Sequence, residues 1–201
     1  MAEQDFCKWT NREEQHRLLK LCGIHQMGFI RGIWTLVTSR EKRNWLRTYT
    51  RAVHSVIFLR KFDTAIGQLN ELLNSDACTD HNRYCALSFL GEVHVWKGEY
   101  EKGKGYLEEA LDLSLKTKER SSELYDFLGY AYFKTGDYTG ALKFFRLACE
   151  YANRGFLNRF YTKHFGQAEE RKTILEEHED LLPFLTAYYN QNRRRFESPS
   201  K

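Results

Sequence analysis

The chain has 201 residues, with 31 Lys or Arg and 27 Asp or Glu, giving a net charge of +4. An apolar share of 42% and an aromatic share of 15% argue against disorder across the chain. The mild charge argues against a strongly electrostatic nucleic-acid binder. The two prolines stand at 183 and 199, and the long proline-free run before them favours helices.

Compartment signals are few. The five cysteines form no CxxC pair, and the first residues lack the apolar core of a secretory signal. No apolar stretch approaches the roughly twenty residues that a membrane span needs. These features predict a cytoplasmic protein without a membrane span, with the nucleus as the alternative.

The first third of the chain predicts helices over residues 11–38, 39–61 and 62–74, followed by a polar connector. Helix pairs are then expected over 84–97 with 101–116 and over 122–135 with 139–152. An amphipathic helix over 155–178 and a short helix over 181–192 complete the expected elements.

The two central helix pairs share a period of thirty-eight residues. The pairs that recur at this spacing are Gly91 and Gly129, Gly98 and Gly136, Tyr100 and Tyr138, Leu107 and Phe145, and Ala110 and Ala148. A fainter copy precedes them, with Phe62, Ala65, Leu69 and Leu72 in register. A fixed period of this size predicts a stacked array of helical hairpins.

Residues at these spacings resemble the tetratricopeptide repeat family, whose Leu-Gly pair is matched by Leu90-Gly91 and Leu128-Gly129. The family period is about thirty-four residues, so each copy here has four additional residues, expected as one extra helical turn. The resemblance implies an all-α, right-handed α-solenoid of helix pairs with flanking capping helices.

The predicted organisation has four parts. An N-terminal helical cap over 1–45 precedes three repeats over 46–153, of which 46–80 is degenerate and 84–117 and 122–153 are clear. A C-terminal helical cap is expected over 154–192, and a flexible basic tail over 193–201.

The sequence offers no catalytic, cofactor-binding or metal-binding residues. Its seven histidines form no zinc motif, and no phosphate-binding loop or nucleophile elbow occurs. An enzyme is therefore not expected, and no cofactor is expected either.

The resemblance instead implies a partner-binding groove, because defined positions of each first helix face the concave side in this family. Carrying those positions over gives an aromatic and mildly acidic surface. Its members are Phe58, Glu92, Trp96, Glu123, Asp126, Tyr130 and Phe133. Two alternatives stay open: Trp96 and Phe133 pack on a neighbouring helix, or the chain itself occupies the groove.

The predicted function is a non-enzymatic adaptor or scaffold that holds a protein partner, a basic and apolar peptide or helix, in this groove. The alternative is a small RNA-binding protein that uses basic and aromatic residues at its ends. These clusters are Arg40, Lys42, Arg43 and Arg47 near Trp45 and Tyr49, and Arg193–Arg195 after Tyr188 and Tyr189. The identity of the partner and the oligomeric state stay open, as does phosphorylation of Ser198 before Pro199.

Overall fold

The computed structural model describes residues 40–76, 78–118, 121–152, 163 and 181–197, and its regular elements in these ranges are all α-helices. The predicted all-α class is confirmed. The chain divides into two compact units, residues 1–79 and 80–201, which are taken separately below. The predicted helix over 11–38 lies outside the described residues, as do Ser198 and, apart from residue 163, the predicted helix over 155–178. No helix in the described ranges is long and apolar enough to span a bilayer.

The first unit contains one helical hairpin, α3 (Arg40–Ile57) and α4 (Phe62–Leu73). Its buried side chains recur at helical spacing: Trp45, Tyr49, Ala52, Val53 and Val56 on α3, and Ala65, Leu69 and Leu72 on α4. The Trp45 and Tyr49 rings stack 5.1 Å apart. The predicted boundary between cap and first repeat at residue 45 therefore falls inside one continuous helix.

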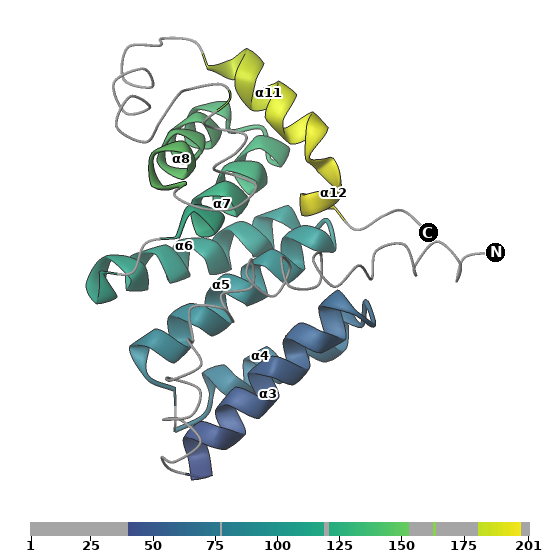
Figure 1. Cartoon of the computed structure of the whole chain (residues 1–201), viewed down its shortest axis with the longest axis vertical. Coiled ribbons are helices and arrows are strands. Elements are labelled where there is room, and N and C mark those ends of the chain that lie inside the picture. The colour runs from purple at the N-terminus through teal and green to yellow at the C-terminus, as the bar shows by residue number, and fades with distance from the viewer. Residues whose placement is uncertain (1–39, 77, 119–120, 153–162, 164–180, 198–201) are drawn as a thin grey trace, which may run out of the picture. The chain divides into compact units, whose positions relative to one another are not determined.

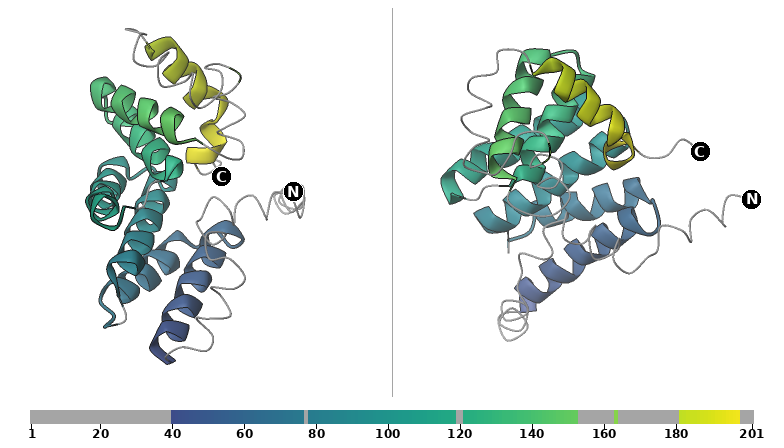
Figure 2. Two further views of the ribbon diagram at one scale, coloured as in Figure 1. Left: turned by 60° about the vertical axis from the view of Figure 1, so that its left-hand side comes forward. Right: turned by 45° about the horizontal axis from the view of Figure 1, so that its top comes forward.

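The second unit contains two further hairpins and a C-terminal segment (Figures 1 and 2). The first hairpin is α5 (Asp80–Trp96) with α6 (Tyr100–Thr117), and the second is α7 (Ser122–Lys134) with α8 (Tyr138–Tyr151). The segment comprises α11 (Leu182–Gln191) and α12 (Arg193–Phe196). The α6 helix has 18 residues and α8 has 14, so the four additional residues of the period form one extra turn of α6.

The turns of the two hairpins have the same hydrogen bonds at equivalent positions. Gly98 and Gly136 both adopt positive φ, 81° and 86°, which glycine tolerates without steric cost. The amide of Glu99 donates to the carbonyl of His94 at 2.9 Å, and the amide of Asp137 donates to that of Tyr132 at 3.0 Å. The thirty-eight-residue period thus describes equivalent backbone geometry.

Two further glycines allow the paired helices to pack closely. A Cβ placed on Gly91 would lie 3.0 Å from the carbonyl oxygen of Gly103 and 2.5 Å from Cγ of Leu107. A Cβ on Gly129 would lie 3.4 Å from the equivalent Ala141 carbonyl and from the Phe145 amide nitrogen, and would also overlap the hydroxyl of Tyr189. Both glycines therefore have the same surroundings in their hairpins, and Gly129 additionally accommodates α11.

The α11 helix packs against α8 and closes the end of the hairpin stack (Figure 2). Leu185, Tyr188 and Tyr189 are fully or almost fully buried, and the rings of both tyrosines contact Phe145. Burial of this apolar side satisfies the need of a repeat array for a terminal cap with one polar face.

The close approach at Gly91 predicts a stability difference between two Gly→Ala variants. Gly91→Ala should lower the free energy of unfolding by about 1–3 kcal/mol, because the methyl group overpacks against Leu107. Gly105→Ala should raise it by up to about 1 kcal/mol, because that helical glycine has nothing within 4 Å. Urea denaturation followed by circular dichroism measures both, and equal stabilities would contradict the close-packing argument.

Candidate functional site

The residues predicted to line the groove are divided between the two units. Phe58 lies in the first unit just after α3, half-buried, with its ring 4.9 Å from that of His54. The other six lie in the second unit: Glu92 and Trp96 on α5, and Glu123, Asp126, Tyr130 and Phe133 on α7. Five residues of these two helices define the α5–α7 face: Glu92, Trp96, Asp126, Phe127 and Tyr130.

The α5–α7 face is covered by α12, which belongs to the tail predicted to be flexible. Residues 193–196 are instead helical, and Phe196 is fully buried. The Phe196 ring stacks on Tyr130 with centroids 4.4 Å apart and meets Phe127 edge-on at 5.2 Å. Aromatic pairs in these arrangements add to the stabilisation that comes from burial alone, and this explains why the segment is ordered.

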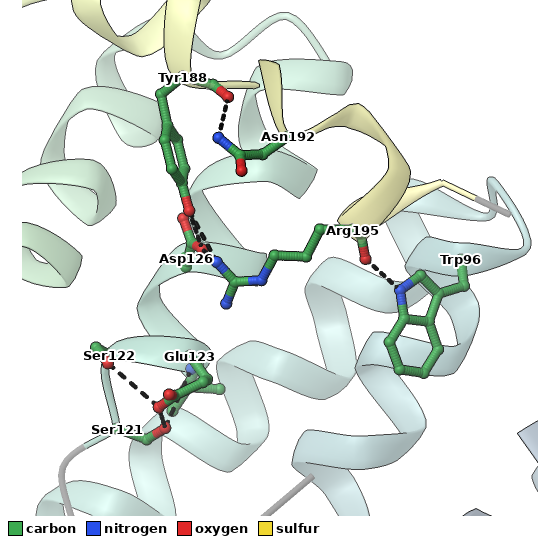
Figure 3. Close-up of polar contacts among 9 residues, drawn as sticks. Trp96, Ser121, Ser122, Glu123, Asp126, Tyr188, Asn192 and Arg195 are labelled. Atoms are coloured by element: carbon green, nitrogen blue, oxygen red, sulfur yellow. Dashed lines mark hydrogen bonds and ion pairs between the residues drawn. The ribbon is translucent and has the colours of Figure 1, made fainter. Parts of the chain in front are cut away.

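A buried ion pair joins α12 to α7. The carboxylate of Asp126, with no exposed surface, pairs with the guanidinium of Arg195, and the Tyr188 hydroxyl donates to the same carboxylate at 2.7 Å (Figure 3). Arg195 also donates to the Tyr188 hydroxyl at 2.8 Å. A buried carboxylate needs such compensation, because removal of its partner leaves a charge in a poorly solvated site.

Trp96 fixes the backbone of α12. Its indole N–H donates to the carbonyl oxygen of Arg195 at 2.6 Å (Figure 3). Carbonyl oxygens in the last turn of a helix have no N–H donor within the helix, so the indole N–H supplies the hydrogen bond to this one. The indole ring also meets Phe89 and Phe127 edge-on, which orients the donor.

Glu197, the residue after α12, contacts α7 at Tyr130 and Lys134. The Tyr130 hydroxyl donates to its carboxylate at 2.5 Å, Lys134 lies 3.0 Å away, and Arg193 pairs with the other oxygen. Burial alone would raise the pKa of Glu197, but these three hydrogen bonds lower it to about 2. The carboxylate therefore stays ionised at neutral pH.

The other predicted acids have different surroundings. The pKa of Glu92 is raised to about 8, mainly by burial and then by the nearby charge of Glu123, while Arg195 acts in the opposite direction. Glu123 accepts hydrogen bonds from the hydroxyls of Ser121 and Ser122 at the start of α7. Its carboxylate is thus bound within its own helix start, where negative charge is favourable.

Phe133 packs toward the C-terminal cap, with its ring 5.3 Å from Tyr189 and 5.7 Å from Tyr138. The structure thus gathers Trp96, Asp126 and Tyr130 around α12, with Glu92 in electrostatic range of Arg195. Sequence reasoning missed Phe127 and the occupants Arg195 and Phe196. One signal was present in the sequence: Phe196 directly follows three arginines, and their positive charge is opposite to that of the predicted acidic surface.

The aromatic members of the two basic clusters are not available as stacking platforms. Trp45 and Tyr49 are 6% and 7% exposed, and Tyr188 and Tyr189 are 0% and 1% exposed. Of the three C-terminal arginines, Arg193 and Arg194 face solvent, whereas Arg195 pairs with Asp126. Within the described ranges, no three His, Cys, Asp or Glu side chains are grouped as a metal site.

Comparison with known families identifies the repeats. Residues 82–154 match the tetratricopeptide repeat, and this span covers α5 to α8. Residues 82–154 therefore form the tetratricopeptide repeats that the residue spacing predicted. Comparisons with curated proteins and with solved structures gave no match. Tetratricopeptide repeats generally mediate protein–protein interaction or scaffolding, so the α5–α7 face is a candidate binding surface.

The buried ion pair predicts that Asp126→Asn releases α12. The amide has no charge to balance the Arg195 guanidinium, and loss of one partner of a buried pair costs about 3–5 kcal/mol. Hydrogen exchange measured by mass spectrometry should show faster exchange over residues 193–197 and unchanged exchange in α8. Asp112→Asn, an exposed change on α6, is the matched control, and equal protection in both variants would contradict this role of Asp126.

The raised pKa of Glu92 predicts a pH dependence of stability. The folded chain keeps this proton up to about pH 8, whereas an ordinary carboxyl loses it near 4.5, so the folded state binds more protons between these values. The free energy of unfolding should therefore fall as the pH rises through this window.

Glu92→Gln should remove that fall and stabilise the protein by about 2–4 kcal/mol at the upper end of the window. Denaturation curves at several pH values test this. An unchanged slope in the variant would show that Glu92 is ionised in the folded chain.

Proposed function

We propose that the protein is a non-enzymatic adaptor that binds a segment of a partner protein on the α5–α7 face. The observation that supports this most directly is that the face already binds a short chain segment, α12, through side chains at positions that the resemblance to the repeat family assigns to the concave side. Trp96 binds a backbone carbonyl, Asp126 a guanidinium, and Tyr130 an aromatic ring. A partner segment would take the place of α12.

The chemistry of this face agrees with the expected partner. Anchors of the Trp and Tyr type dominate the binding energy of protein interfaces, and the carboxylate of Asp126 favours a basic ligand. Binding of RNA through the terminal clusters has less support, because their aromatic side chains are buried. A cytoplasmic location stays a prediction.

Affinity capture followed by quantitative mass spectrometry tests the proposal. Trp96→Ala combined with Tyr130→Ala should reduce recovery of the specific partner to background, because two anchors of the face are lost. The helical circular dichroism signal should persist, since the close contacts between paired helices, of Gly91 with Gly103 and of Gly129 with Ala141, remain.

Leu115→Ala combined with Tyr138→Ala is the matched control, since it also removes two large side chains from the same unit. These residues are 66% and 51% exposed and lie off the α5–α7 face, so partner recovery should equal that of the native chain. Equal recovery by both double variants would refute the α5–α7 face as the binding surface.

A further inference from the structure

The contacts of α12 are concentrated on two adjacent residues, as in a bound ligand. Arg195 and Phe196 both point into the α5–α7 face, whereas Arg193 and Arg194 are exposed. A helix of four residues is too short to be stable alone in water. Its conformation therefore depends on the surface that binds it, and Arg195 and Phe196 make the contacts with that surface.

The guanidinium of Arg195 lies beside a carboxylate and two aromatic rings. Asp126 binds the guanidinium, whose central carbon also lies 5.8 Å from the Phe127 ring centroid and 5.2 Å from that of Phe196. An ion pair with a carboxylate between two aromatic rings favours the planar, weakly hydrated guanidinium of arginine over lysine, whose ammonium is a compact and strongly hydrated charge.

The phenylalanine site and the indole donor add two further requirements. Phe196 is enclosed by Phe127, Tyr130 and Tyr189, with its centroid 5.5 Å from that of Tyr189. The Trp96 N–H requires a carbonyl oxygen without another donor. The last turn of a helix supplies such a carbonyl, so a helix that ends in Arg-Phe meets all three requirements at once.

The cap and the ligand are separate parts of the C-terminal segment. The α11 helix packs against α8 through Leu185 and Tyr189, and Gly129 provides room for the Tyr189 hydroxyl. Release of α12 therefore leaves the end of the hairpin stack covered. The face that it exposes has the Asp126 carboxylate beside three aromatic rings.

We propose that the α5–α7 face recognises a partner helix that ends in an arginine followed directly by a phenylalanine, and that Arg195-Phe196 is the chain's own copy of this ligand. The inference rests on the proposed adaptor function and names its partner class. Because α12 is tethered, its effective concentration at the face is about millimolar. A partner must therefore compete with the tethered α12 in order to bind the face.

A peptide with the sequence of residues 192–197, labelled with fluorescein at its amino end, is the probe. Fluorescence anisotropy measures its binding to the full chain with Arg195→Ala and Phe196→Ala, which releases α12. We expect saturable binding to this released chain and at least tenfold weaker binding to the native chain. Adding Asp126→Asn to the released chain should weaken binding at least tenfold.

The same peptide carrying Arg195→Lys tests the arginine requirement and should bind the released chain at least tenfold more weakly. If the released chain does not fold, the unlabelled peptide is instead added in excess to the native chain. Hydrogen exchange over residues 193–197 should then accelerate with peptide concentration, and should not accelerate with the lysine peptide.

Three outcomes would overturn the inference: no peptide binding or displacement, equal binding of the arginine and lysine peptides, or no effect of Asp126→Asn. A native mass that doubles with concentration, and returns to the monomer value when Arg195 and Phe196 are replaced, would assign the face to a second copy of the chain and also overturn it. If the peptide fails while Trp96→Ala with Tyr130→Ala still abolishes partner capture, the adaptor function stands and the Arg-Phe ligand does not.

Discussion

The carboxylate of Asp126 has no exposed surface, and such a group is stable only with a positive partner and hydrogen bonds. Arg195 and Tyr188 supply both, from a segment more than sixty residues later in the chain. This one requirement connects the repeat to the C-terminal segment. It orders residues that would otherwise form a polar terminus, and it gives the α5–α7 face its preference for a guanidinium.

The hairpins provide a platform rigid enough for that recognition. Gly91 and Gly129 let the helices of each pair approach so closely that an added Cβ would touch the backbone of the paired helix. Gly98 and Gly136 adopt positive φ in the turns, which have matching hydrogen bonds. Because the two hairpins repeat the same geometry, residues of α5 and α7 present a donor, a carboxylate and aromatic rings side by side. Trp96, Asp126 and Tyr130 thus act on one short segment.

The helix pairs could be predicted from the sequence because their signals are local: glycine at each turn, apolar residues at helical spacing, and a repeat that places both in register. Positions in that repeat also located Trp96, Asp126 and Tyr130. The occupant could not be predicted in this way. Arg193–Phe196 has no helical periodicity of its own, and distant contacts with Phe127 and Tyr130 stabilise it. Phe58 belongs to the other unit, so it is not assigned to one site with the other six residues that the sequence predicted for the groove.

The most direct measurement is nuclear magnetic resonance of the full chain in solution. Contact of α12 with the α5–α7 face predicts nuclear Overhauser effects between the ring protons of Phe196 and Tyr130, whose centroids lie 4.4 Å apart. It also predicts an indole N–H resonance of Trp96 that is protected from exchange. Random-coil shifts and fast backbone motion over residues 193–197, without those Overhauser effects, would contradict the account.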